Sequence, residues 1–81
     1  MNDMVEISSM DQVSSLITLH RKKAKLSRNN LALLAGVGKT LIYNLEHASH
    51  NVGFNAILRV LHVLNLKLCM ISPLSAQLNP R

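Results

Sequence analysis

Residues 28–45, RNNLALLAGVGKTLIYNL, contain the feature that most constrains the fold: two short helical patterns separated by four residues. The joint between them, residues 35–38 with the sequence AGVG, is too short to be anything but a tight corner. Gly36 lies where the first helix must stop and the chain must reverse, a place that favours the left-handed conformation that costs glycine almost nothing. Ala32 is the small residue where the two helices would meet. This spacing is typical of a helix-turn-helix, and an ordinary helical hairpin is the simpler alternative.

Apolar residues recur at helical spacing on both sides of the corner, so both segments can turn one face toward a shared core. These residues are Leu31, Ala35, Ile42 and Leu45. The opposite face of the second segment is polar and is free to enter a DNA major groove, with its first turn closest to the base edges. We therefore predict four base-reading side chains: Lys39, Thr40, Tyr43 and Asn44.

A chain of 81 residues has room for one domain. Such a small chain buries only about 60% of its unfolded surface, so a partner subunit is a reasonable expectation. Hydrophobic residues make up 48% of the chain but aromatic residues only 2%, so the core must be built from Leu, Ile and Val. The scarcity of rings argues against a protein that stacks unpaired bases of single-stranded nucleic acid.

The formal net charge of +5 is distributed unevenly along the chain. Three of the four acids lie in the first eleven residues, and a basic stretch without acids follows up to Glu46: Arg21, Lys22, Lys23, Lys25, Arg28 and Lys39. The simplest interpretation is a solvated helix end, because cations near a helix C-terminus are favoured by its dipole. Beside a helix-turn-helix, a phosphate-facing surface is the preferred interpretation. The predicted DNA-backbone contacts are Ser27, Arg28, Lys22, Lys23 and Lys25.

Cysteine usage and hydropathy indicate a cytoplasmic protein that does not bind membranes. Cys69 is the only cysteine, so a disulfide framework and a cysteine zinc cluster are excluded. The N-terminus lacks a basic region followed by an apolar run, which argues against a secretory signal. The most apolar segment, residues 54–71, is interrupted by charged residues and is not expected to span a bilayer.

Two further helices are expected outside the helix-turn-helix. Ser9 and Gln12 form a capping box for a helix over residues 11–24. Its core face would consist of Val13, Leu16, Ile17, His20 and Ala24. Ser27 is the expected N-cap of the helix that ends at Ala35, and the next helix covers residues 39–46. The last helix covers residues 54–64, with Asn65 as its C-cap; its expected core residues are Phe54, Ile57, Leu58, Leu61 and Leu64.

Residues 66–71 alternate weakly and are followed by a proline, which predicts a short strand. The residues of this predicted dimer strand are Leu66, Lys67, Leu68, Cys69, Met70 and Ile71. A lone strand must pair, either with the arm at residues 4–7 or with the same strand of a second subunit. A two-fold axis would also set two recognition helices one DNA turn apart. The expected organisation is an arm (1–9), a DNA-binding domain (10–65), a dimerisation strand (66–74) and a flexible tail (75–81).

Residues 13–66, which include HRKKAKLSRNNLALLAGVGKTLIYNLEHASHNVGFNAILRVLHVLNL, resemble the Xre family of helix-turn-helix repressors. Within that family the chain is similar to HipB-type antitoxins, because of the lead-in at residues 7–13 and the strand that directly follows the last helix. The resemblance implies an all-α, lambda-repressor-like bundle of four to five helices, and a homodimer joined by a small shared sheet. It also implies binding to operator DNA upstream of the protein's own operon and inhibition of a HipA-type serine/threonine kinase toxin.

Three residues depart from the family pattern within the helix-turn-helix. Arg28 stands where the family usually has the glutamine that reaches the DNA backbone, and a phosphate contact is still available to it. Gly38 replaces the usual capping serine, and Tyr43 occupies a position that is more often small. The operator sequence of a relative therefore cannot be transferred to this chain.

Two other classes of function compete with a DNA-binding repressor: an enzyme or metal protein, and a protein-interaction module. An enzyme or metal protein would need more than the pair His47 and His50, since two ligands do not make a zinc site, and we predict neither a metal nor a cofactor. A protein-interaction module would use exposed apolar residues, for which Leu33 and Leu41 are the candidates. A plain repressor without a toxin partner is a third possibility.

Overall fold

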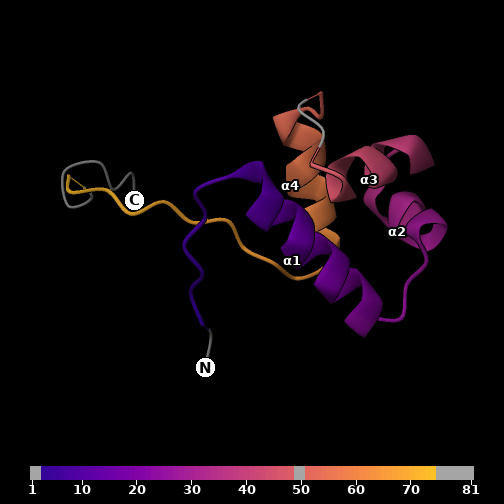
Figure 1. Ribbon diagram of the computed structural model, residues 1–81, viewed down its shortest axis with the longest axis horizontal. Helices are drawn as coiled ribbons and strands as arrows, with labels where there is room; N and C mark the ends of the chain where they lie inside the picture. The colour runs from indigo at the N-terminus through magenta and orange to yellow at the C-terminus, as the bar shows by residue number, and fades with distance from the viewer. Residues whose placement is uncertain (1–2, 49–50, 75–81) are drawn as a thin grey trace.

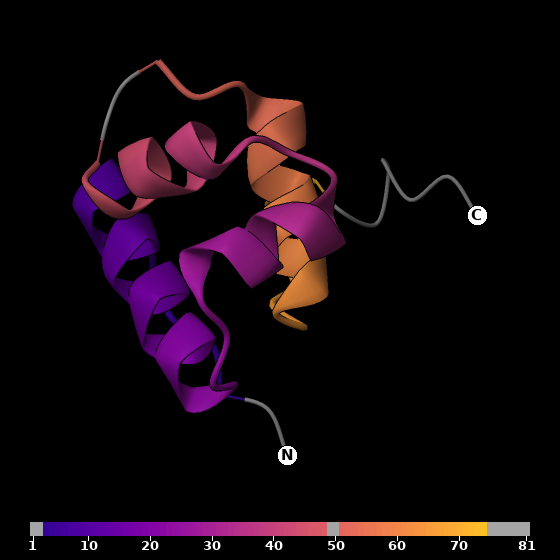
Figure 2. The same ribbon diagram turned by 90° about the vertical axis from the view of Figure 1, so that its right-hand side faces the viewer.

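The computed structural model describes residues 3–48 and 51–74, which contain four α-helices: α1 (Met10–Lys23), α2 (Arg28–Ala35), α3 (Lys39–Glu46) and α4 (Phe54–Val63). Helix α2 packs against both α3 and α4, and α1 lies against α3 (Figure 1). Figure 2 shows the short helices α2 and α3 joined by their tight turn. The predicted all-α helix-turn-helix bundle is therefore confirmed, and the predicted bounds of α2 and α3 match those observed.

The local signals identified in the sequence define the beginnings and ends of the helices. The Ser27 hydroxyl accepts a hydrogen bond of 3.0 Å from the backbone N–H of Asn30, which caps α2. Gly36 adopts the left-handed conformation, with φ 70° and ψ 35°, and ends the same helix. At the start of α1, the Gln12 side-chain oxygen accepts from the backbone N–H of Ser9, as the capping box predicts. Helix α1 itself covers residues one position earlier than predicted.

The core lies where the four helices meet and consists of aliphatic side chains. Its buried apolar residues are Ile17, Leu31, Ala32, Ala35, Ile42, Leu45, Val60 and Leu61. The four core positions expected on either side of the turn are all among them. A buried polar contact adds to this packing, because the Ser14 hydroxyl donates a hydrogen bond to the backbone carbonyl of Leu45. Helix α3 is thus fixed against α1 at its C-terminal end.

The orientation of α4 differs from the prediction. Phe54 and Leu58, both expected in the core, are exposed, whereas Val60 is fully buried. Ile57, Leu61 and Leu64 do pack in or against the core, as predicted. The polar residues Asn55, Arg59 and His62 fall on one side of the helix. Phe54 and Leu58 lie closer to that side than Val60 does, so the expected face was rotated from the buried one. The helix also ends one residue early, with Leu64 as its C-cap, and Asn65 follows in a left-handed conformation with φ 60°.

The end of α1 shows a smaller error of the same kind. Ala24, expected on the core face, is exposed because it is the C-cap residue that follows the helix. His20 is half-buried on the expected face of the helix. The core face of α1 is therefore shorter than the periodicity suggested.

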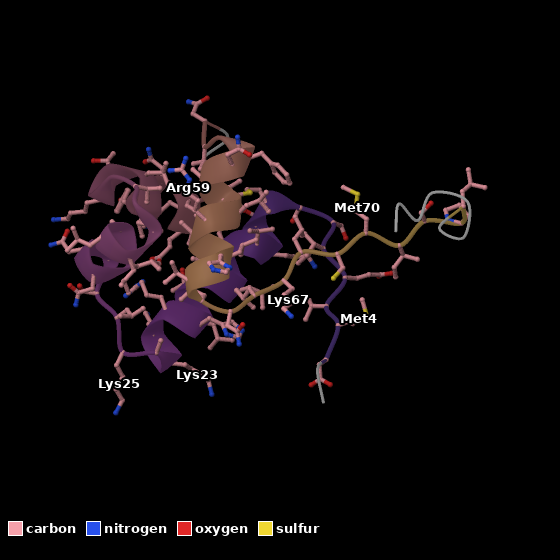
Figure 3. The ribbon with its side chains drawn as sticks, turned by 180° about the vertical axis from the view of Figure 1, so that it is seen from behind. Met4, Lys23, Lys25, Arg59, Lys67 and Met70 are labelled. Atoms are coloured by element: carbon pink, nitrogen blue, oxygen red, sulfur yellow. The ribbon has the colours of Figure 1, made fainter. Side chains whose placement is uncertain are left out.

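Two segments leave the bundle: the N-terminal arm, and the chain that follows α4 (Figure 1). Residues 3–8 and 66–72 have no regular secondary structure, and the described part of the chain contains no strand. Met4 lies on the arm and Met70 on the C-terminal segment, and both are exposed (Figure 3). The expected strand is therefore not formed within one chain, and its pairing across a dimer stays a prediction. The expected tail, residues 75–81, lies outside the described residues.

Candidate nucleic-acid interface

The outer face of α3 carries the side chains expected to read bases. Lys39, Thr40 and Tyr43 are exposed, and Asn44 is half-buried. This arrangement follows from helical geometry, since Ile42 and Leu45 are fully buried on the opposite side. The first turn of α3, with Lys39 and Thr40, therefore presents the more accessible part of this surface. That these four residues contact bases stays a prediction.

Tyr43 lies between two other side chains and is half exposed. Its ring stacks on the His47 ring, with centroids 3.9 Å apart and an interplanar angle of 22°. The guanidinium carbon of Arg28 lies 5.5 Å from the centroid of the Tyr43 ring, within the range of a cation–π interaction. His47 Nδ1 lies 2.7 Å from the backbone carbonyl oxygen of Tyr43, and because that oxygen can only accept, Nδ1 must carry the donated proton. The conformation of Tyr43 is therefore restrained by neighbours that precede and follow it in sequence.

Glu46, the last residue of α3, is hydrogen-bonded to one residue of α1 and to one residue of α2. Only 1% of its side chain is exposed, and each of its carboxylate oxygens accepts a hydrogen bond from Arg21. Arg28 Nε donates a further bond of 2.9 Å to Glu46 Oε1. Arg21 Nη1 also donates to the backbone carbonyl of Leu26, at 2.9 Å. We call Arg21, Glu46 and Arg28 the arginine–glutamate network; it connects the end of α1, the start of α2 and the end of α3.

The two arginines determine the ionisation of Glu46. Burial alone would raise the pKa of this carboxyl, because desolvation disfavours the charged form. The hydrogen bonds from Arg21 and Arg28, together with their positive charges, outweigh burial and lower the pKa below its ordinary value of 4.5. Glu46 is therefore an ionised acid at neutral pH and balances one of the two guanidinium charges.

Arg21 is not part of a phosphate-facing surface, and that expectation was wrong. The side chain is buried and pairs with Glu46, which lies 25 residues away in sequence. The other predicted cations, Lys22, Lys23, Lys25 and Arg28, retain access to solvent. Figure 3 shows Lys23 and Lys25 pointing away from the bundle. The basic surface therefore begins one residue later than the charge pattern suggested.

The arginine–glutamate network was missed in the sequence. In the sequence, Glu46 is only the acid that ends the basic stretch, and no helical spacing relates it to Arg21 or Arg28. The available signal was an acid at the last position of an otherwise acid-free segment, which would be expected to attract one of the preceding cations. Arg21 and Arg28 both lie far from Glu46 in sequence, and only the fold brings the three side chains together.

The two apolar candidates for a protein interface differ in exposure. Leu33 is 79% exposed on the outer side of α2, whereas Leu41 is half-buried and packs against the core. Leu34, which the sequence did not single out, is also exposed. Within one chain, Leu41 therefore contributes to core packing, whereas Leu33 does not.

No metal-binding cluster of three or more His, Cys, Asp or Glu side chains occurs among the described residues. His50, one of the two histidines considered and rejected as a metal site, lies outside the described residues. None of the helices in residues 3–48 and 51–74 has both the length and the apolar character needed to cross a membrane.

The fold defines a helix-turn-helix bundle, and several solved structures share it. The chain is similar to a chain of the HipA–HipB–O2–O3 complex, with 21% identity, a TM-score of 0.77, and coverage of 86% of this chain and 99% of that chain. It is also similar to a chain of the HipB–O4 20mer complex (21% identity, TM-score 0.76, 86% and 99% covered). A chain of the HipB–O1–O2 complex gives 22% identity, a TM-score of 0.76, and coverage of 85% and 100%.

No family model matches the chain, and no curated protein matches its sequence. The structural likeness therefore establishes a shared fold over most of the chain.

Proposed function

We propose that the chain is a dimeric, sequence-specific DNA-binding repressor that acts as the antitoxin of a toxin–antitoxin operon. It represses its own operon and neutralises a HipA-type serine/threonine kinase toxin. In this proposal the molecule works by binding, not as an enzyme, and it acts in the cytoplasm. No cofactor is required.

The observation that carries this proposal is the fold, combined with what the fold exposes. Chains of the same fold occur in complexes of HipB with HipA, O2, O3 and O4. In this chain, the helix equivalent in order and position to a recognition helix presents Lys39, Thr40 and Tyr43 to solvent. A major groove is wide enough for such a helix, and it displays donors and acceptors that side chains of these types can read.

The backbone contacts in this proposal come from the start of α2 and the end of α1. Ser27 and Arg28 lie beside the C-terminal half of α3, because Arg28 contacts both Tyr43 and Glu46. The exposed side chains of Lys22, Lys23 and Lys25 add positive charge that attracts phosphate groups. Phosphate contacts position the protein, and the α3 side chains discriminate between sequences.

A protein-interaction module is the second candidate, and one observation favours it. Leu33 and Leu34 expose two large apolar side chains on α2, which a partner protein could cover. A plain repressor without a toxin is a restricted form of the main proposal. These alternatives predict different binding partners and can therefore be separated in solution.

Selection of duplexes from a random-sequence DNA library by the purified chain tests the repressor. Enriched duplexes with two inverted half-sites about one helical turn apart are expected for a symmetric dimer. Affinity for these duplexes should fall steeply with salt, since phosphate contacts release counterions. The Lys39→Ala/Thr40→Ala variant should keep its helical circular-dichroism spectrum and its affinity for unrelated DNA, but lose the preference for selected duplexes.

Failure to enrich any sequence would contradict sequence-specific repression and support the interaction module. The antitoxin role needs a separate measurement, which is the activity of a HipA-type kinase from the same genome with and without the chain. Inhibition at stoichiometric concentration is expected. Selective DNA binding without inhibition would leave a plain repressor.

A further inference from the structure

We propose that Glu46 is a positioning residue for DNA binding: it holds Arg28 by its Nε, so that the terminal nitrogens of the guanidinium are presented to a DNA phosphate. This inference rests on the proposed function, because the anion in question is the DNA backbone. Glu46 is itself almost fully buried and cannot touch DNA. Its effect on binding would be transmitted through Arg28.

The charge balance of the arginine–glutamate network leaves one cation for an external partner. Arg21 donates to both oxygens of Glu46, and only 10% of its side chain is exposed, so this pair is internally neutral. Arg28 is then a surplus positive charge, with 40% of its side chain exposed. An anion bound at Arg28 would restore neutrality.

The location of Arg28 also favours an external anion over a purely structural role. It is the first residue of α2, where the positive end of the helix dipole disfavours a cation. The first turn of α2 contains no acid that could compensate for it. A phosphate at this place would interact with both the guanidinium and the helix N-terminus.

The geometry of the guanidinium specifies which of its atoms would bind. Arg28 Nε is used by Glu46, and within residues 3–48 and 51–74 neither Nη1 nor Nη2 of Arg28 donates a hydrogen bond. The Tyr43 ring lies against the guanidinium, which limits its movement about the bond to Glu46. The planar guanidinium can donate to two oxygens of one phosphate while its Nε remains bound to a carboxylate.

Lysine could not perform both tasks. An ammonium is a compact point charge on a flexible chain, so it can lie beside Glu46 or reach outward to a phosphate, but it lacks the rigid fork that does both. The Arg28→Lys substitution therefore preserves charge and removes the proposed geometry. This makes it the most informative single variant, and Arg28 is exposed enough for the fold to tolerate the change.

The test measures affinity by fluorescence anisotropy for a library-selected duplex and for an unrelated duplex, each over a range of salt concentrations. Arg28→Gln should weaken binding to both duplexes by roughly 10- to 100-fold, as expected for one charge-assisted hydrogen-bonded contact. The slope of log affinity against log salt should become shallower by about 0.9 for each Arg28–phosphate contact, and so by about 1.8 for a dimer that makes two of them. The affinity loss likewise applies to each contact. Arg28→Lys should lose most of the same affinity. Wild-type affinity and slope in Arg28→Lys would overturn the proposal.

Glu46→Gln tests the positioning step directly. In a folded sample, verified by circular dichroism, it should weaken binding in the wild-type background and have no further effect in the Arg28→Gln background. An undiminished effect in that background would show that Glu46 does not act through Arg28. If Glu46→Gln does not fold, the Arg28→Lys result decides alone.

Arg59→Gln is the matched control, because it removes one positive charge from an exposed residue outside the network. Arg59 Nη1 donates to the Gly36 carbonyl at 3.4 Å, so circular dichroism must first show that this variant is folded. A smaller change than in Arg28→Gln is expected, because Arg59 is exposed and makes no hydrogen bond to Glu46 or Arg28. If the wild type shows no sequence preference but Arg28 variants weaken binding to all DNA, the inference stands and the repressor proposal fails. The reverse pattern overturns only the inference.

Discussion

The arginine–glutamate network and the C-terminal segment, residues 66–74, differ in whether their side chains find partners within the chain. In the network, a buried carboxylate receives hydrogen bonds from two arginines, and the part of the chain described here leaves no buried side-chain polar atom without a partner. In the C-terminal segment, large apolar side chains are left in solvent: Leu68, Met70, Ile71 and Leu74. In the network, buried charges are paired within the chain. In the C-terminal segment, apolar side chains are exposed and would be stabilised by contact with another surface.

This contrast between paired charges and exposed apolar side chains indicates which parts of the fold one chain can specify alone. A buried charge without partners is strongly unfavourable, so the network must form whenever α1, α2 and α3 pack. An exposed apolar side chain carries a smaller penalty, which a second molecule can remove by covering it. We therefore infer a bundle that folds within each chain and a C-terminal segment whose order depends on pairing with a second copy.

The largest effect is expected inside the bundle, from a pair of leucines on the same helix. Leu31 is fully buried and Leu33 is 79% exposed. Leu31→Ala should lower the free energy of unfolding by about 2–5 kcal/mol, because it leaves a cavity that only partly relaxes. Leu33→Ala should change it by less than about 0.5 kcal/mol. Urea unfolding followed by circular dichroism measures both, and similar losses for the two variants would mean that Leu33 is covered in solution.

The next effect is expected outside the bundle. Met70 and Ile71 are 90% and 87% exposed within one chain. Replacing both with aspartate should leave the helical spectrum unchanged but weaken self-association by about 100-fold, equivalent to about 2.7 kcal/mol. The cause is that two charges would enter an apolar contact.

Sedimentation equilibrium measures this dissociation constant. The single substitution Lys22→Asp serves as a control with the same change in net charge, since Lys22 is exposed on α1. An unchanged dimer in the Met70→Asp/Ile71→Asp variant would place the contact elsewhere and break the contrast between the two regions.

The sequence predicted the helix-turn-helix well because its signals are local. Ser27 caps α2, Gly36 ends it in the left-handed conformation, and Ile42 and Leu45 select one face of α3. Each of these effects depends on residues within a few positions of one another. Helix bounds and core residues in this region therefore follow from short-range geometry.

The remaining features depend on residues far apart in sequence. Arg21 and Glu46 are brought together only when α1 packs against α3, and no spacing rule anticipates that pair. On α4, Phe54 is exposed because no other part of the described chain covers it, whereas Val60 is fully buried. The charge pattern predicted a basic surface, but only the fold shows which cation is withdrawn from it.

Acid should weaken the bundle through Glu46, which sharpens the contrast because the C-terminal segment has no acid. The pKa of Glu46 is lowered in the folded chain, so its stabilisation is fully present above the unfolded pKa and is lost as pH falls through the folded pKa. The free energy of unfolding should therefore decrease as pH falls through the ordinary pKa of 4.5 and on through the lower pKa of the folded chain. Urea unfolding at several pH values measures this dependence.

Glu46→Gln is the control for the pH dependence, since every other acid is common to both chains and cancels in the difference. Its free energy of unfolding should fall less over the same interval. Parallel pH profiles of the wild type and the variant would show that the ionised carboxylate does not contribute to stability.

The smallest effect concerns the turn between α2 and α3, where two glycines offer a matched pair. An added Cβ would meet no atom within 4 Å at either Gly36 or Gly38, so steric contact with other residues cannot distinguish them. Gly36 has φ 70°, whereas Gly38 has φ −78°. Gly36→Ala should lower the free energy of unfolding by about 1–2 kcal/mol, because an L-residue is strained in the left-handed region. Gly38→Ala should be within about 0.5 kcal/mol of the wild type, since alanine adopts that conformation without strain. Equal losses measured by urea unfolding would mean that the turn is selected by something other than backbone conformation. A loss at Gly36 alone would show that the backbone conformation of this residue selects the turn.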